Sequence, residues 1–108
     1  MIARKRLRLR IESGAQGDLD EMQDRDPAAF GFAIVAVREA LARPHAMERK
    51  GGKLIGHWSV AFPAGHGDDA QSGRLVVRME GQVLVLVAVD ENHDRAYTKA
   101  RARVKSKR

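Results

Sequence analysis

The sequence contains no cysteine, only three prolines, and few aromatic residues: one tryptophan, one tyrosine and three phenylalanines among 108 residues. The lack of cysteine excludes disulfide bonds, thiolate metal sites and cysteine nucleophiles. No apolar run approaches the roughly 20 residues that a membrane-spanning helix needs. The first ten residues carry charges where a secretory signal would be apolar. We therefore expect a soluble, cytoplasmic protein.

Basic residues outnumber acidic ones, which gives a formal net charge of +6, and they gather near the two ends of the chain. Residues 1–10 hold five lysines or arginines and residues 99–108 hold six, without an acid in either segment. Such polarity suits a polyanion, which releases counterions when its phosphates are neutralised, and it equally suits an acidic protein. The length predicts a single domain over 1–104, with 105–108 as a basic, flexible tail.

Residues 73–90 show the clearest pattern, which is that of two strands joined by a tight turn at Gly81. In the first strand apolar residues alternate with small or charged ones and share one face: Leu75, Val77 and Met79. Arg74 and Arg78 share the other face, pointing away from the main core. Residues 83–89 are apolar throughout, so the second strand is expected in the interior.

Residues 6–11 alternate arginine with apolar residues, which predicts a half-buried strand with three inward side chains: Leu7, Leu9 and Ile11. Residues 14–22 predict a short helix. A longer helix follows, because Asp26 can cap free backbone N–H groups and Pro27 suits the first helical position. Its apolar stripe continues at helical spacing until Pro44 ends it: Phe30, Ile34, Val37 and Leu41.

The second half of the chain adds a loop over 45–55, a strand over 58–62, a long loop over 63–72 and a helix over 92–104 capped by Asn92. The strand places three side chains on one face: Trp58, Val60 and Phe62. The resulting element order is β-α-α-β-β-β-α. It predicts an α+β fold, with a mainly antiparallel sheet, two N-terminal helices on one face and a C-terminal helix.

Short motifs stand at the element boundaries: Asp26-Pro27, Gly56-His57-Trp58-Ser59, Gly73-Arg74-Leu75-Val76-Val77, and His93 with Ala96-Tyr97. In this element order the chain resembles the RelE/ParE superfamily of small bacterial toxins. The resemblance implies a ribosome-associated messenger RNA endonuclease that a cognate antitoxin inhibits. Members most like YoeB imply roles for Glu48, Arg74 and His93. Members most like RelE imply roles for Lys50 or Lys53 and for Tyr97.

The same residues suit the chemistry of metal-free RNA cleavage, which needs a base for the 2′-hydroxyl, a cation for the phosphorane and an acid for the leaving oxygen. Glu48 or His93 is the candidate base, Arg74 the cation and His93 the acid. Tyr97 orients the phosphate or stacks on a base. The product would carry a 2′,3′-cyclic phosphate. The candidate RNA-binding residues are Lys50, Lys53, Trp58, Arg78, Arg6 and Arg8.

Each candidate has a structural alternative. Trp58 fits a core position, Glu48 a solvated ion pair, and His93 a helix-capping turn. Arg74 and Arg78 also fit surface charges that discourage edge pairing. His57 is expected to be an exposed bystander. The histidines have no metal-ligand spacing, so no metal or other cofactor is indicated: His45, His57, His66 and His93.

Two other functions remain open. The first is a protein-binding toxin that inhibits DNA gyrase, as the ParE branch does. The second is a non-catalytic basic module that binds RNA or the ribosome. For the nuclease, we expect an acidic antitoxin segment to occupy the basic sheet face formed by four arginines: Arg6, Arg8, Arg74 and Arg78.

Overall fold

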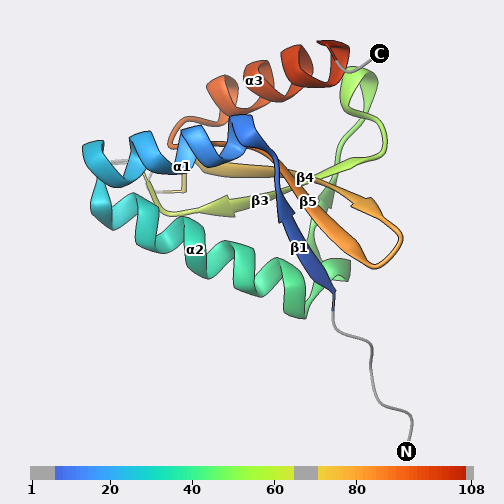
Figure 1. Ribbon diagram of the computed structural model, residues 1–108, viewed down its shortest axis with the longest axis horizontal. Helices are drawn as coiled ribbons and strands as arrows, with labels where there is room; N and C mark the ends of the chain where they lie inside the picture. The colour runs from blue at the N-terminus through green and yellow to red at the C-terminus, as the bar shows by residue number, and fades with distance from the viewer. Residues whose placement is uncertain (1–6, 65–70, 107–108) are drawn as a thin grey trace, which may run out of the picture.

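The computed structural model describes residues 7–64 and 71–106, which form a sheet flanked by helices (Figure 1). In chain order the elements are β1 (Arg8–Ile11), α1 (Ser13–Arg25), α2 (Pro27–Ala42), the 3-10 turn η1 (Pro44–Ala46), β2 (Glu48–Arg49), the 3-10 turn η2 (Gly52–Leu54), β3 (His57–Phe62), β4 (Gly73–Glu80), β5 (Val83–Asp90) and α3 (His93–Ser106). The predicted α+β class and element order are confirmed. The one added strand is β2, within the segment expected to be a loop.

The described strands form one sheet in the order β1-β5-β4-β3-β2. β1 runs parallel to β5, and every other pair is antiparallel, so the expectation of a mainly antiparallel sheet is confirmed. Gly81 joins β4 to β5 with φ of 60°, a conformation that glycine adopts without strain. Residues 84–90 of β5 are all buried, which confirms its predicted interior place.

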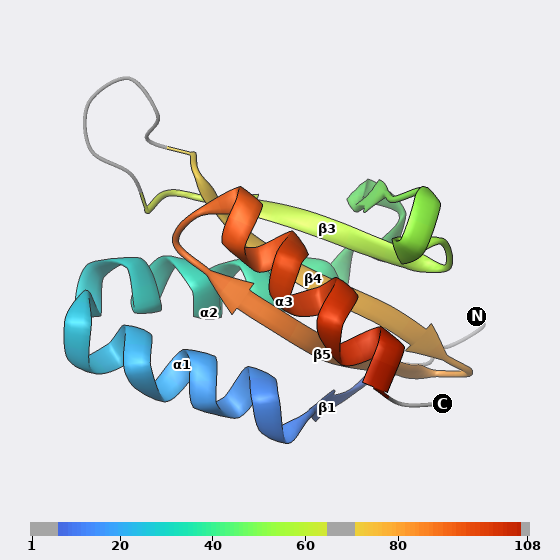
Figure 2. The ribbon, with the colours of Figure 1, turned by 90° about the horizontal axis from the view of Figure 1, so that it is seen from above.

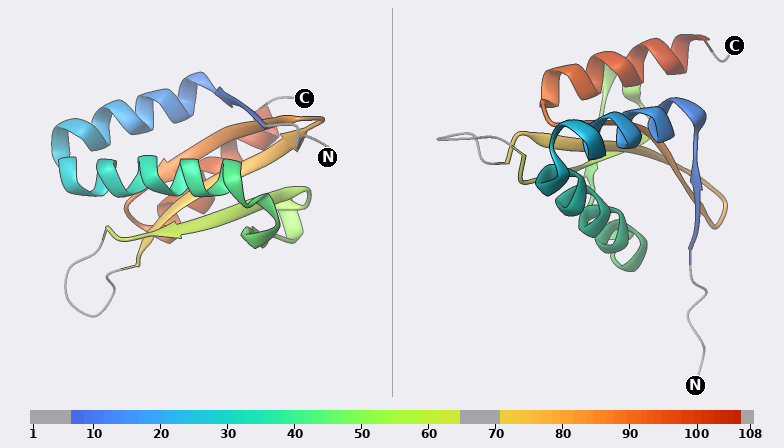
Figure 3. Two further views of the ribbon diagram at one scale, coloured as in Figure 1. Left: turned by 90° about the horizontal axis from the view of Figure 1, so that it is seen from below. Right: turned by 60° about the vertical axis from the view of Figure 1, so that its left-hand side comes forward.

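The sheet separates two hydrophobic clusters (Figures 1 and 2). α1 and α2 lie side by side on one face (Figure 3), where they cover Leu75 and Val77, and α3 packs on the other face over Val76. The β4–β5 register slips by one residue, because Val76 pairs with Ala88 whereas Val77 pairs with Leu86. This bulge turns two consecutive residues of β5, Val87 and Ala88, toward the α3 cluster.

Alanines form most of the α2 surface that meets the sheet. The buried residues are Ala29, Ala33, Ala36, Val37 and Ala40. Of the predicted stripe, only Val37 is fully buried, and the larger side chains flank the contact half-buried: Phe30, Ile34 and Leu41. The predicted start is confirmed, since the Asp26 side chain accepts a hydrogen bond from Ala29 N at 3.1 Å. No helix in the described ranges combines the length and apolar character needed to cross a membrane.

The ends of the chain depart from the predicted pattern. Leu9 was expected to point inward but is 39% exposed, because β1 is an edge strand and the core reaches only Ile11. At the other end α3 includes Lys105 and Ser106, the first two residues of the expected tail. Arg6 and residues 107–108 lie outside the described ranges.

Gly73 opens β4 directly opposite Phe62, whose ring occupies the place of a side chain. A Cβ at residue 73 would lie 2.4 Å from the ring. Phe62 is 1% exposed, so it has no room to move. We therefore expect Gly73→Ala to lower the free energy of unfolding by about 2 kcal/mol, measured by urea unfolding followed through Trp58 fluorescence.

Gly17 provides the control, because a Cβ there would have no heavy atom within 4 Å and the residue is exposed on α1. Gly17→Ala should raise stability by roughly 0.5 to 1 kcal/mol through helix propensity. If both alanine variants were as stable as wild type, the close packing of Phe62 on Gly73 would be contradicted.

Two buried acids anchor α3 to the rest of the domain. Asp18 of α1 is 6% exposed and Asp90 of β5 is 3% exposed. Lys99 of α3 joins them, with Nζ 3.2 Å from Asp18 Oδ1 and 2.7 Å from Asp90 Oδ2. Arg103 adds a 2.6 Å contact to Asp18, and Arg95 a 3.0 Å contact to Asp90. The helix is therefore held by charge as well as by its apolar face.

Asp90 makes stability depend on acid pH. Burial raises the pKa of the Asp90 carboxyl. Hydrogen bonds from Lys99, the Asn92 backbone and Arg95 lower that pKa by a larger amount, so the folded pKa lies below its ordinary value. Its stabilising contribution is therefore present above the unfolded pKa of about 3.9 and is lost as pH falls through the folded pKa. We expect Asp90→Asn to be less stable at neutral pH and to lose less stability on acidification. The urea midpoints of wild type and Asp90→Asn are measured from pH 7 to pH 3. Midpoints that fall by the same amount in both proteins would contradict this expectation.

Candidate functional site

The sheet presents a row of polar side chains toward the first turns of α3. Glu48 of β2 is directly opposite Ser59 of β3, and Arg74 of β4 is opposite Ala61, the next position on the same side of β3. Cross-strand partners point to the same face of a sheet. Because Ser59 contacts Tyr97 of α3, this row faces α3. The structure thus brings the segment before β3, the start of β4 and the start of α3 to one place.

Tyr97 lies at the centre of this cluster. Its hydroxyl donates to Ser59 Oγ at 3.4 Å and accepts from Lys50 Nζ at 3.4 Å. Lys50 Nζ also lies 4.5 Å from the centre of the phenol ring, within the range of a cation–π contact. One helical turn earlier is His93, whose ring centre lies 6.5 Å from that of Tyr97.

The helix start fixes the position of both rings. Asn92 Oδ1 accepts a hydrogen bond from Arg95 N at 3.0 Å, so the predicted cap is confirmed. His93 Nδ1 lies 2.9 Å from a carboxylate oxygen of Asp94, and its side chain is 40% exposed. The imidazole is therefore open to solvent at the rim of the cluster.

Glu48 occupies the opposite rim. Its side chain is 73% exposed, and its carboxylate accepts from Lys50 Nζ at 3.4 Å. Lys50 is more enclosed, with a side chain that is 21% exposed. Lys50 therefore links the exposed carboxylate of Glu48 to the half-buried phenol of Tyr97.

Arg74 supplies a half-buried cation beside the same phenol. Its guanidinium donates to the carbonyl oxygens of Gln71 and of Gly73, the latter at 2.8 Å, and it hydrogen-bonds to Tyr97. Over residues 7–64 and 71–106, no carboxylate forms an ion pair with it. Its positive charge is therefore not neutralised by an acid of the described chain.

These contacts change the acidity of Tyr97. Burial raises the pKa of the phenol, but hydrogen bonds with Ser59, Lys50 and Arg74 and the charge of Lys50 lower it by more. The net effect is a pKa below the ordinary value for tyrosine. The cluster therefore stabilises negative charge at the phenol oxygen relative to a tyrosine in water, as a site that receives negative charge requires.

Three predicted RNA-binding residues are not part of the cluster. Arg78 lies four residues along β4 and pairs with Glu12 at 3.1 Å and Glu80 at 2.6 Å. Arg8 is exposed on β1, at the sheet edge opposite β2. Trp58 is half-buried and packs against the α1/α2 cluster, on the face of the sheet away from Tyr97. This is the core position that was the alternative to an RNA-binding role. Arg6 lies outside the described residues. The other three arginines of the expected basic face, Arg8, Arg74 and Arg78, do not form one open surface, because Arg8 lies at the far edge of the sheet and Arg78 is paired.

Two side chains of β3 differ from the sequence prediction. His57 was expected to be exposed, and Ser59 was given no functional role. His57 is instead 6% exposed, because it points to the side where Leu54 of η2 is buried against α3. Its Nε2 has no hydrogen-bond partner among the described residues. Ser59 was not singled out, although alternation from Trp58 places it on the α3 side. Lys53 is exposed on η2.

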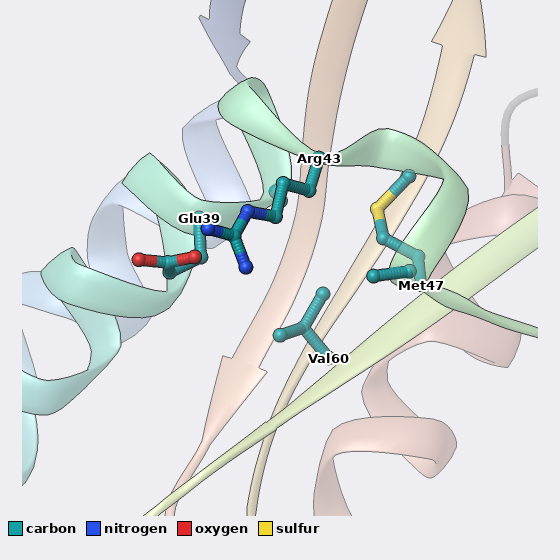
Figure 4. Close-up of a pocket in the computed structure, with 6 residues that line it drawn as sticks. Glu39, Arg43, Met47 and Val60 are labelled. Atoms are coloured by element: carbon teal, nitrogen blue, oxygen red, sulfur yellow. The ribbon is translucent and has the colours of Figure 1, made fainter.

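Two cavities lie outside the cluster. One of about 120 Å³ is bounded by the end of α2, η1 and β3 (Figure 4), with six lining residues: Glu39, Ala40, Arg43, Ala46, Met47 and Val60. It belongs to the α2 side of the sheet. The other is lined by six charged residues, three of which, Asp90, Arg95 and Lys99, form ion pairs that anchor α3: Glu21, Arg25, Asp90, Glu91, Arg95 and Lys99. The part of the chain that the structure describes has no group of three histidines or acids arranged to hold a metal ion, and His66 falls outside that part.

Comparison with solved structures finds proteins of similar fold. No protein-family model matches the sequence, and no curated protein matches it. A chain in the crystal structure of the toxin-antitoxin complex RelBE2 from Mycobacterium tuberculosis superposes with a TM-score of 0.56, over 85% of this chain and 98% of that one. This chain has a RelE-like fold. At 19% sequence identity this likeness shows the fold alone. Any statement about chemistry therefore depends on the residues of the cluster.

Proposed function

We propose that this chain is the toxin of a type II toxin–antitoxin system and that it cleaves messenger RNA without a metal ion. One observation carries the proposal. Arg74, which has no acidic partner among the described residues, lies beside the phenol of Tyr97, whose pKa is lowered. His93 and Lys50 lie around the same ring. A surface that only binds RNA would not need this arrangement of titratable groups. The RelE-like fold supports the same reading.

In the proposed reaction the 2′-hydroxyl oxygen attacks the adjacent phosphorus while Glu48 or His93 takes its proton. Arg74 and Lys50 balance the additional negative charge on the phosphorane, and Tyr97 orients the phosphate. The bond to the 5′ oxygen then breaks, and His93 in its protonated form supplies the proton to the leaving group. The products are a 2′,3′-cyclic phosphate and a free 5′-hydroxyl.

We further propose that the protein acts in the cytoplasm on ribosome-bound message and that an acidic antitoxin inhibits it. RelBE2 is itself a toxin-antitoxin complex. The formal charge of +6 makes an acidic partner the electrostatically favoured one. Such a partner would cover the exposed rim of the cluster at Glu48 and His93 and thereby exclude RNA.

The test is cleavage of a defined message, free and on ribosomes, by the purified protein in a buffer with a metal chelator. The expected result is cleavage that leaves 2′,3′-cyclic phosphate ends. Intact RNA together with loss of gyrase supercoiling would overturn the proposal in favour of a gyrase inhibitor. RNA that is bound in a salt-dependent manner but not cut would identify a non-catalytic module.

A further inference from the structure

Ser59 places a hydroxyl group 3.4 Å from the Tyr97 phenol oxygen, on a strand that is paired on both sides. The residue is 3% exposed, and its backbone lies between Glu48 on one side and Val76 on the other. A serine hydroxyl accepts a hydrogen bond from a phenol and donates one to a phenolate. Ser59 can therefore keep its contact with Tyr97 in both ionisation states.

The contact of the phenol oxygen with Lys50 is less constrained. Lys50 reaches Tyr97 through a long, flexible side chain, and the same Nζ also contacts the exposed Glu48. Lysine carries several rotatable bonds, whereas serine carries one that places its oxygen. Of these two groups that touch the Tyr97 oxygen at 3.4 Å, Ser59 is the rigid one.

We propose that Ser59 is a positioning residue, whose buried hydroxyl fixes the Tyr97 phenol in its place between Lys50 and Arg74. The catalytic part of this inference depends on the proposed RNA cleavage. The contact itself acts on Tyr97 without RNA, and it helps to keep the pKa of the phenol below its ordinary value. The inference therefore has a readout that is independent of activity.

Tyr97 is the only tyrosine in the chain, so an alkaline titration of ultraviolet absorbance reports its ionisation alone. Removing the hydroxyl with Ser59→Ala should raise the Tyr97 pKa by roughly 0.5 to 1, the effect of losing one hydrogen bond to the ionised form. Ser59→Thr keeps the hydroxyl and should leave this pKa near the wild-type value. Circular dichroism of each variant checks that the fold is retained.

Ser72→Ala is the matched control. Ser72 is also a buried serine, 7% exposed, but its Oγ donates to the Glu91 carbonyl at 2.6 Å and makes no contact with Tyr97 among the described hydrogen bonds. It should leave the Tyr97 pKa unchanged. A Tyr97 pKa that Ser59→Ala does not raise, or that Ser72→Ala raises equally, would overturn the inference.

The kinetic readout separates positioning from binding. Ser59→Ala should lower kcat for RNA cleavage by about fivefold with little change in KM, and Ser59→Thr should restore it. Equal kcat for Ser59→Ala and wild type would overturn the positioning role. If wild-type protein cut no RNA, the proposed function would fail and the catalytic part with it. The tyrosine titration would then still decide whether Ser59 holds the phenol.

Discussion

Arg74→Ala is expected to lower the rate of RNA cleavage by about 100- to 1000-fold, the usual effect of removing a group that stabilises transition-state charge. The structure gives a reason for an effect of this size. Arg74 is held by the Gly73 carbonyl at 2.8 Å and by the Gln71 carbonyl, which orient the guanidinium without neutralising it. No acid within residues 7–64 and 71–106 forms an ion pair with Arg74, so within that part of the chain its charge stays available for the phosphate. Single-turnover cleavage of ribosome-bound message measures the change.

Arg78→Ala is the matched control, because Arg78 lies on the same face of the same strand but is already paired with Glu12 and Glu80. This variant loses the same charge, yet it should cleave RNA within about twofold of wild type and should lose only about 1 kcal/mol of stability. Equal losses of cleavage in the two variants would show that Arg74 acts through net charge alone. Equal cleavage by Arg74→Ala and wild type would remove Arg74 from the mechanism.

A companion variant tests the imidazole. His93→Ala should slow cleavage by about 100-fold if His93 supplies the proton to the leaving oxygen. His45 is a suitable control, since it is an exposed histidine on η1 that faces none of these groups in the described contacts. A His93→Ala protein that cleaves as fast as wild type and as the His45→Ala control would exclude the acid role.

The sequence predicts the strands and helices well because their signals are local. Alternation defines β4, and the aspartate–proline pair defines the start of α2. The remaining features depend on contacts between distant segments. Ser59 gains its importance only from a tyrosine 38 residues away, and His57 becomes buried only when η2 and α3 pack together. No periodicity within a strand could have revealed either contact.

The candidate site divides in the same way. The resemblance to a toxin family selected Arg74, His93 and Tyr97, and the fold brings them together with Lys50. Trp58 was proposed for base stacking because aromatic residues often have that role. Its own strand pattern, shared with Val60 and Phe62, already indicated the core face, and that pattern decided its place.

Asp18→Asn is expected to lower the free energy of unfolding by about 3 kcal/mol, because it breaks a buried, hydrogen-bonded ion pair while leaving its cations in place. The Asp18 carboxylate accepts from Arg103 Nη1 and Nη2 at 2.6 and 2.9 Å, from Lys99 at 3.2 Å and from the Val89 backbone at 3.0 Å. An amide has the same shape but lacks the charge and offers one acceptor oxygen instead of two. Urea unfolding followed by circular dichroism and Trp58 fluorescence measures the loss.

Asp24→Asn removes the same charge from an exposed position of the same helix and should change stability by less than about 0.5 kcal/mol. The double variant Asp18→Asn with Arg103→Leu distinguishes the source of the loss. If the cost comes from a cation left without its carboxylate, the double variant should be more stable than the sum of the two single losses predicts. Additive losses, or a stable Asp18→Asn protein, would show that the Asp18 ion pairs do not hold α3, and the Asp90 pairs with Lys99 and Arg95 would be its remaining charged anchors. The position of Tyr97 would then not depend on Asp18, and Asp18→Asn should leave cleavage intact wherever the domain remains folded.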